Sequence, residues 1–319
     1  MRVLAFQNIG EVGVNSVATS AESESVEGPL CGVVVTYFPA EDVERRLMAI
    51  AKQVDVLVVI DNSASEAVTS RLEPIIARMS AHLVSNCDNL GVATALNQGV
   101  AFARTRDAAR VAFFDQDSEP VDEFRSEMDS VRSNYNRAAP LGILGCNYIQ
   151  ADRLKAHFPA DRMGFVSVDH VITSGSMYDV AMLTKLGRFK DEFFIDGIDI
   201  EYCWRALANG YCVCRTKRPL MFHVLGNPVQ HTFLGRNLGT SNHPAFRRYF
   251  MARNAVLILR EYFLRLPRPA LHLLNIHLKG LVLLSAFEAH RAKKLGFVFL
   301  GLWHGLQRRM DMKPWHLAK

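Results

Sequence analysis

Two carboxylates one residue apart follow an apolar segment of this 319-residue chain. In the run RVAFFDQDSEP, Asp115 and Asp117 come directly after Phe114. In an extended or turning segment both carboxylates can reach one ligand, and carboxylate oxygens suit hard divalent cations such as Mg²⁺ or Mn²⁺. A cation held there could neutralise the charge of a departing phosphate. The same pair of residues also occurs where Asp only caps a helix or ends a turn.

A third carboxylate ends another apolar segment. Asp61 follows VLVVI in the same way that Asp115 follows RVAFF. The carboxyl ends of parallel strands meet at one edge of an open α/β sheet, which is where such folds bind their ligands. We therefore expect the two side chains at one sheet edge. The alternative for Asp61 is a turn residue beside Asn62 and Ser63.

Alternating strands and helices must position these side chains. Strand patterns occur at 31–38, 54–62, 82–86 and 110–117, and helical patterns at 66–79 and 92–104. Further strands are predicted at 141–149, 168–178 and 211–216, with a helix at 199–209. This alternation predicts an α/β fold with a mainly parallel, Rossmann-like sheet and helices on both faces.

The C-terminal part has a different pattern. Beyond Pro244 the sequence predicts long, Leu-rich, basic helices at 244–266 and 271–310. Lys279, Glu288 and Arg291 interrupt the apolar residues, so we expect no membrane-spanning helix. The mixture of apolar and basic residues instead predicts helices that lie on an anionic membrane surface. The alternative is a helical pair packed against the rest of the chain or a partner subunit.

Composition limits the possible classes of protein. Hydrophobic residues make up 49% of the chain, which excludes disorder throughout, and a net charge of +5 does not indicate a nucleic-acid partner. Six scattered cysteines lack a zinc-site spacing. Cys212 and Cys214 lie on one face of a predicted strand and suggest buried thiols in a reducing cytosol. The chain contains neither G-x-G-x-x-G after its first strand nor a phosphate-loop motif, which argues against dinucleotide oxidoreductases and phosphate-loop NTPases.

A set of short segments gives a more specific indication. GVVVTYFP, VVIDNSAS, NLGVATALNQG, FFDQDSEP, TSGSMYD, FIDGIDIEYCWRA and MFHVLG occur in this order. Together they resemble family 2 glycosyltransferases, and most of all the rhamnosyltransferase branch. The resemblance covers about 31–254 and implies a GT-A fold. We therefore expect a flexible leader at 1–30, a GT-A domain at 31–254 and a helical, membrane-associating region at 255–319.

The resemblance assigns a donor site. It implies that Asp61 accepts a hydrogen bond from the pyrimidine ring N–H, that Asp117 binds the metal, and that Asp115 contacts the metal or ribose. His223 would approach the diphosphate or metal, although a lone His often fills a core position. Asn89 could equally cap a helix, and the arginines could form a solvated basic face. The other residues implied for donor binding are Thr36, Tyr37, Pro39, Asn89, Gly91, Asn97, Gln116, Arg248 and Arg253.

The resemblance also assigns the residues that act on the acceptor. Asp199 matches the carboxylate that acts as general base on the acceptor hydroxyl. Ile198 stands where the family more often has an acid, so Asp196 is a second candidate for this task. Helix capping is the alternative role of Asp199. Ser174 and Gly175 are expected in a turn on the acceptor side.

The resemblance implies a metal-assisted, inverting transfer of L-rhamnose from dTDP-L-rhamnose to a hydroxyl of a glycan or glycolipid, with Mg²⁺ or Mn²⁺ as cofactor. Two acceptors fit the resemblance, a lipid-linked glycan and a rhamnolipid precursor. The alternatives are another nucleotide-sugar transferase of this fold and a non-catalytic, membrane-bound nucleotide-binding subunit. We expect a cytoplasmic enzyme, peripheral on the inner face of the cell membrane, for which oligomers are possible.

Overall fold

The structure is a computed structural model, and it describes residues 28–150, 155–159, 164–223, 229–233 and 236–310. The leader predicted at 1–30 lies almost wholly outside the described residues. The chain divides into two compact units. A sheet unit comprises Thr19–Phe194 and Ile198–Val224, and a helical unit includes Ile195–Gly197 and Leu225–Lys319.

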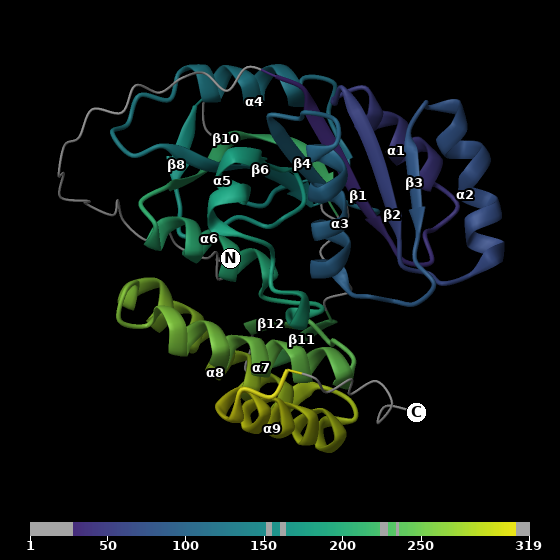
Figure 1. Ribbon diagram of the computed structural model, residues 1–319. Helices are drawn as coiled ribbons and strands as arrows, with labels where there is room; N and C mark the ends of the chain where they lie inside the picture. Colours follow the sequence, from purple (N-terminus) through teal and green to yellow (C-terminus); the bar gives the residue numbers. More distant parts are fainter. Residues whose placement is uncertain (1–27, 151–154, 160–163, 224–228, 234–235, 311–319) are drawn as a thin grey trace. The chain divides into compact units, whose positions relative to one another are not determined.

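A single mixed sheet forms the centre of the sheet unit, in the order β3-β2-β1-β4-β9-β6-β10-β5 (Figure 1). Strands β1, β2, β3, β4, β6 and β10 run in one direction, because β6 and β4 are both antiparallel to β9, which lies between them. Their bounds are β1 Leu30–Thr36, β2 Val56–Asp61, β3 His82–Ser85, β4 Arg110–Asp115, β6 Leu141–Gln150 and β10 Cys212–His223. The antiparallel strands are β5 Glu119–Pro120, β7 Lys155–Ala156, β8 Phe165–Ser167 and β9 Ser176–Asp179.

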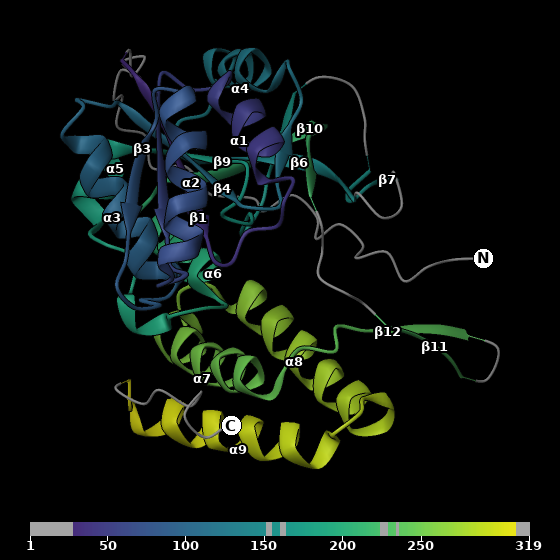
Figure 2. The same ribbon diagram turned by 90° about the vertical axis from the view of Figure 1, so that its right-hand side faces the viewer.

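Helices cover both faces of this sheet (Figures 1 and 2). They are α1 Val43–Ala51, α2 Glu66–Arg78, α3 Val92–Arg104, α4 Phe124–Ser133, α5 Val180–Leu186 and α6 Ile198–Ala208, with a 3₁₀ turn at Asp191–Phe193. Helix α3 packs on β1 and β2, whereas α4 packs on β6 and β10. The predicted fold class and the mainly parallel direction of the strands are confirmed.

Apolar patterning explains these elements. Strands β1, β2 and β4 are buried along most of their length, as expected for strands covered on both faces. Helix α1 turns Val43, Leu47 and Ile50 inward, which is the 3.6-residue period of an amphipathic helix. One prediction differs. The strand expected at 168–178 is shortened to β9, and its residues before Ser176 form a turn and loop.

Among its described residues, the helical unit contains three long helices and a hairpin. Its hairpin consists of β11 Val229–Phe233 and β12 Arg236–Thr240, and its helices are α7 Ala245–Tyr262, α8 Pro267–Phe287 and α9 Arg291–Gln307. Helices α7 and α9 approach closely at Gly301, where a Cβ atom would lie 2.4 Å from the Tyr249 carbonyl oxygen. The domain boundary predicted at 254 falls inside α7.

A buried ion network ties these helices together. Glu288, which follows α8, accepts hydrogen bonds from Arg248 of α7 and from Lys294 of α9, the latter at 2.8 Å. All three residues are buried. Lys294 also donates to Asn242 at 2.7 Å. Lys294 therefore neutralises an internal carboxylate, and it does not belong to the basic surface that the sequence predicted.

Helix α8 departs from one expectation. It is 21 residues long, and an 18-residue window has a mean hydropathy of 1.5, so by length and composition it could cross a membrane. Lys279 is expected to interrupt the apolar residues. A single charge within a long helix nevertheless leaves the mean hydropathy of the window high enough for a membrane span. Core helices of soluble proteins can be equally long and apolar, but they are mostly buried, whereas only 17% of this window is buried.

Candidate functional site

Three side chains with metal-binding atoms meet at the carboxyl edge of the sheet. Asp115 ends β4, Asp117 follows it, and His223 ends β10. One ligand atom from each lies within 4.8 Å of the others. Strands β4 and β10 are not neighbours, but because they run in the same direction their ends reach the same edge. Two carboxylates and one imidazole form a set of donors that fits Mg²⁺ or Mn²⁺, with the imidazole favouring Mn²⁺.

A chain of two serine hydroxyls supports this cluster. Ser118 Oγ lies 2.9 Å from His223 Nδ1 and 2.7 Å from Ser174 Oγ. Ser174 Oγ in turn accepts the backbone N–H of Asp115 at 3.0 Å. Ser118 and Ser174 are both buried. The hydroxyl chain therefore joins two residues of the cluster, as outer-shell groups do in metal sites.

Ser174 and Gly175 were predicted on the acceptor side. In the structure Ser174 belongs to the hydroxyl chain described above. Gly175 has a φ of +71°, and a Cβ atom there would lie 2.5 Å from Cys146 Sγ. Its N–H donates to the carbonyl of Phe113 at 2.8 Å. Ser174 and Gly175 therefore contact the residues that support the cluster. Their contact with an acceptor stays a prediction.

A second polar site surrounds Asp61 at the end of β2. Its Oδ1 accepts hydrogen bonds from Thr36 Oγ1 and Ser63 Oγ, each at 2.7 Å. Asp61 is wholly buried, and its Oδ2 has no hydrogen-bond partner among the described residues. A buried carboxylate oxygen without a donor is costly, so this atom is suited to accept a hydrogen bond from a ligand N–H.

The loop after β1 presents exposed aromatic rings next to Asp61. Tyr37 and Phe38 are exposed by 51% and 55%. Gln116 holds this loop, because its Oε1 accepts the N–H of Tyr37 at 2.7 Å and its Nε2 donates to the carbonyl of Tyr37 at 3.2 Å. Ser63 Oγ accepts the N–H of Phe38 at 2.7 Å. Gln116 therefore links the metal-binding segment to the loop beside Asp61. The carbonyl of Pro39 accepts a hydrogen bond from Arg71.

The segment with Asn89, Gly91 and Asn97, which the resemblance assigns to donor binding, is held by its own hydrogen bonds. Asn89 Oδ1 accepts the N–H of Gly91 at 3.0 Å, and Asn62 Nδ2 donates to the carbonyl of Gly91 at 3.1 Å. Asn97 donates to the carbonyl of Phe189 at 2.9 Å and to Asp191 at 2.8 Å. Asn97 is thus engaged on α3, while Asn62 connects the Asp61 segment to Gly91.

The predicted base lies at the beginning of α6. Asp199 is in the first turn, and its Oδ1 accepts the N–H of Ile200 at 2.8 Å. A neighbouring pair was missed by sequence reasoning: His170 Nδ1 lies 2.7 Å from Asp169 Oδ1. Burial lowers the pKa of His170, but Asp169 and the charge of Asp199 outweigh it and raise the pKa above its usual value. The charge of the predicted base thus favours the protonated form of His170.

The remaining predicted residues belong to the helical unit. Asp196 accepts hydrogen bonds from Arg247 at 2.8 to 3.1 Å. Arg248 pairs with Glu288, and Arg253 is wholly buried and donates to Asn254 at 3.0 and 3.1 Å. Asp196, Arg248 and Arg253 thus all have protein partners. Their predicted contacts with donor or acceptor stay predictions.

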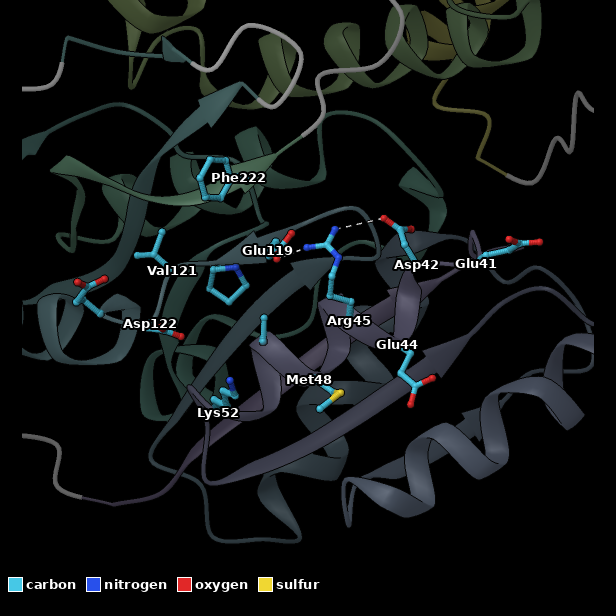
Figure 3. A pocket seen from close by; sticks show the side chains of 13 residues that line it. Glu41, Asp42, Glu44, Arg45, Met48, Lys52, Glu119, Val121, Asp122 and Phe222 are labelled. Atoms are coloured by element: carbon cyan, nitrogen blue, oxygen red, sulfur yellow. Dashed lines mark hydrogen bonds and ion pairs between the residues drawn. The ribbon is translucent and has the colours of Figure 1, made fainter.

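An open groove of about 800 Å³ lies elsewhere on the sheet unit, along α1 and β5 (Figure 3). Arg45 extends into it and pairs with Asp42 and Glu119. Its carboxylates outnumber its cations, which are Arg45 and Lys52. The carboxylates are Glu41, Asp42, Glu44, Glu119, Asp122 and Glu123. An anionic ligand is disfavoured there, so the groove is not suited to a diphosphate.

Comparison with known proteins agrees with this geometry. Residues 32–128 match the family description "Glycosyl transferase family 2". A relative from Shigella flexneri, dTDP-rhamnosyl transferase RfbF, is 29% identical over 245 residues, which cover 72% of this chain and 79% of the relative.

Solved structures of low identity show the fold. Mannosyltransferase PcManGT from Pyrobaculum calidifontis, solved with GDP-Man and Mn²⁺, has a TM-score of 0.54 at 15% identity and covers 89% of each chain. S. aureus TarS 1-349 has a TM-score of 0.52 at 12% identity, with 91% of this chain and 74% of TarS covered.

A mixed sheet of this topology, together with these structural neighbours, shows a GT-A-like fold. The family match at 32–128 and the Shigella flexneri relative together support a family 2 glycosyltransferase that is similar to dTDP-rhamnosyl transferases.

Proposed function

We propose that the protein transfers L-rhamnose from dTDP-L-rhamnose to a hydroxyl of a glycan or glycolipid, with inversion and with help from a divalent cation. One observation carries the proposal. Asp61, whose Oδ2 has no partner among the described residues, ends its strand at the same sheet edge as the cluster of Asp115, Asp117 and His223. One group can accept a ring N–H and the other can hold a cation beside a diphosphate. The identity with a dTDP-rhamnosyl transferase supports the choice of sugar and nucleotide.

Each residue has a distinct task in this proposal. Asp115, Asp117 and His223 hold Mg²⁺ or Mn²⁺, which neutralises negative charge on the diphosphate leaving group. Tyr37 and Phe38 border the thymine, and Asp61 accepts its ring N–H. Asp199 takes the proton from the acceptor hydroxyl. Because Asp196 is already engaged by Arg247, we assign the base to Asp199 alone.

Donor profiling tests the proposal. The protein is incubated with a panel of dTDP-, UDP- and GDP-sugars and a mixture of glycan and lipid acceptors, and products are identified by mass spectrometry. A mass increase of one deoxyhexose from dTDP-L-rhamnose is expected. Transfer only from another nucleotide sugar identifies a different transferase of this fold, and binding of dTDP without any transfer identifies a nucleotide-binding subunit.

The configuration of the product is a second expected result. One base and one leaving group describe a single displacement, in which the acceptor oxygen bonds to the anomeric carbon as the dTDP oxygen leaves. The new linkage therefore has the anomeric configuration opposite to that of the donor. One-bond carbon–proton couplings in the NMR spectrum of the product measure it, and retention would exclude a single displacement.

Replacing Asp61 by Asn should weaken dTDP binding by about 10- to 100-fold, because a hydrogen bond to a charged group contributes about 1.5–3 kcal/mol. Calorimetry measures the dissociation constant. The matched control is dTDP methylated at the ring N–H, which should bind poorly to the wild type and lose nothing further in the Asp61→Asn variant. If methylation weakened binding equally in both proteins, the ring N–H would not contact Asp61.

The helical unit carries the proposed membrane surface. Helix α8 exposes Leu271, Leu274, Leu278 and Val282, which recur at helical spacing along one stripe. Helix α9 exposes a second stripe of Phe299, Trp303 and Leu306. Basic residues Lys279, Arg291, Arg308 and Arg309 are also exposed. Two apolar stripes accompanied by positive charge suit helices at an anionic membrane surface.

Flotation with liposomes tests this surface. Each Lys or Arg near an anionic surface contributes about 1 kcal/mol, so binding should weaken with added salt. Changing Leu278, Val282, Phe299 and Trp303 together to Gln should release the protein, whereas Met48→Gln, a change at an exposed apolar residue of the sheet unit, should not. Recovery of wild type and variant alike in the soluble fraction would contradict membrane binding. Binding that resists high salt and alkaline extraction would indicate a spanning helix instead.

A further inference from the structure

The chain leaves the sheet unit at one point within its predicted active site. Ile195–Gly197 belongs to the helical unit, although the residues on both sides belong to the sheet unit. Helix α6, with Asp199 in its first turn, begins at the next residue, Ile198. The contacts that hold 195–197 therefore act on the chain directly before α6.

Two residues of α7 hold this segment. Arg247 donates two hydrogen bonds to the Asp196 carboxylate, from Nε to Oδ2 at 2.9 Å and from Nη2 to Oδ1 at 2.8 Å. Asn254 Nδ2 donates to the backbone carbonyls of Ile195 at 3.0 Å and Asp196 at 2.7 Å. We call these contacts of Arg247 and Asn254 with 195–196 the α7 clamp.

Buried neighbours fix the orientation of the α7 clamp. Arg253 is wholly buried and donates to Asn254 Oδ1, so the amide of Asn254 must direct its nitrogen at the two carbonyls. Burial and the charge of Arg247 lower the pKa of His243 to about 4, against the opposite effect of Asp196. His243 is therefore neutral near pH 7 and does not compete with Arg247 for the carboxylate.

The backbone held by the α7 clamp has an uncommon conformation. Phe194, Asp196 and Gly197 have φ values of +55°, +65° and +75°. Non-glycine residues adopt this left-handed region at a cost, and they remain in it where surrounding contacts leave no alternative. The bidentate pair and the two carbonyl contacts are such surrounding contacts. Loss of the clamp would let the segment relax and would change the approach to α6.

We propose that Arg247 and Asn254 are positioning residues for Asp199, and that Asp196 acts through Arg247 as part of the same device. This inference rests on the proposed role of Asp199 as base. A displacement of a reacting group by about 1 Å can reduce a rate by about 100-fold. Removal of the α7 clamp should therefore lower kcat and leave the donor KM nearly unchanged, because the residues proposed for donor binding in the sheet unit are untouched.

Four variants test the proposal by kinetics. Arg247→Ala should lower kcat by about 10- to 100-fold, and Arg247→Lys should restore part of it. Asp196→Asn should resemble Arg247→Ala, and the double variant should be no worse than either one, because both remove the same interaction. Arg260→Ala, at another arginine of α7, is the matched control and should keep wild-type kcat. Additive losses in the double variant would overturn the proposal.

Hydrogen exchange gives a readout that is independent of activity. Peptides covering 195–203 should exchange faster in Arg247→Ala than in wild type, and at the wild-type rate in Arg260→Ala. Unchanged exchange in Arg247→Ala would overturn the positioning role. The proposed base is checked separately, because Asp199→Asn should lose transfer with unchanged exchange. If Asp199→Asn stays active while Arg247→Ala exchanges faster, the base assignment fails and the effect of the clamp on the backbone remains.

Discussion

Replacement of Asp117 by Ala should abolish sugar transfer and leave the fold intact. The side chain lies at the carboxyl edge of the sheet and is 35% exposed, so it adds little to the core. Without it the cation would be held by Asp115 and His223 alone. Charge stabilisation by a bound cation is worth several kcal/mol, so we expect a loss of roughly 10³-fold or more in kcat. The rate of rhamnosyl transfer measures this loss.

Asp122→Ala is the matched control, because it removes another carboxylate of the sheet unit that does not belong to the cluster. The wild type should also lose activity in EDTA and regain it with Mg²⁺ or Mn²⁺. Binding of Mn²⁺, followed by electron paramagnetic resonance, should weaken in Asp117→Ala and stay normal in Asp122→Ala. Full turnover of dialysed wild-type protein in EDTA would disprove the cation site.

The second large effect is expected at Asp199. Asp199→Asn keeps the shape of the side chain and its contact with the N–H of Ile200, but it removes the group that accepts the acceptor's proton. General acid–base catalysis contributes about 10²- to 10⁴-fold, so kcat should fall by that amount. Calorimetry should find donor binding unchanged.

Asp196→Asn is the informative comparison for this result. Asp196 lies three residues before Asp199, but its carboxylate pairs with Arg247. The Asp196→Asn change should therefore lower kcat less than Asp199→Asn. A larger loss in Asp196→Asn than in Asp199→Asn would show that the base was assigned to the wrong carboxylate. Loss of donor binding in Asp199→Asn would show instead that Asp199 belongs to the donor site.

Local patterns were sufficient for most of the sheet unit. The predicted helix at 92–104 has the same bounds in the structure, and the strands that precede Asp61 and Asp115 end at these residues. Periodicity does not specify the order of strands, because pairing depends on contacts between residues distant in sequence. The central antiparallel β9, only four residues long, therefore could not be placed from the sequence.

The site was predictable where side chains directly follow strands. The sequence singled out Asp61, Asp115, Asp117 and His223 for this reason. Ser118 was missed, although a serine directly after the paired carboxylates is a signal that a supporting hydroxyl is available. The partners of arginine were not predictable: a basic pattern on α7 says nothing about Glu288, which lies 40 residues beyond Arg248.

The hydroxyl chain is compatible with one particular proton arrangement of His223. Ser174 Oγ accepts from the Asp115 N–H and lies 3.8 Å from Met221 Sδ, to which it can donate. Ser118 can then donate to Ser174 and accept the Nδ1 proton of His223. In this arrangement Nδ1 carries hydrogen, and Nε2 keeps the lone pair that a ligand atom requires. In this arrangement a buried thioether ends the chain of donors, and side chains from separate strands and loops would together decide the imidazole tautomer.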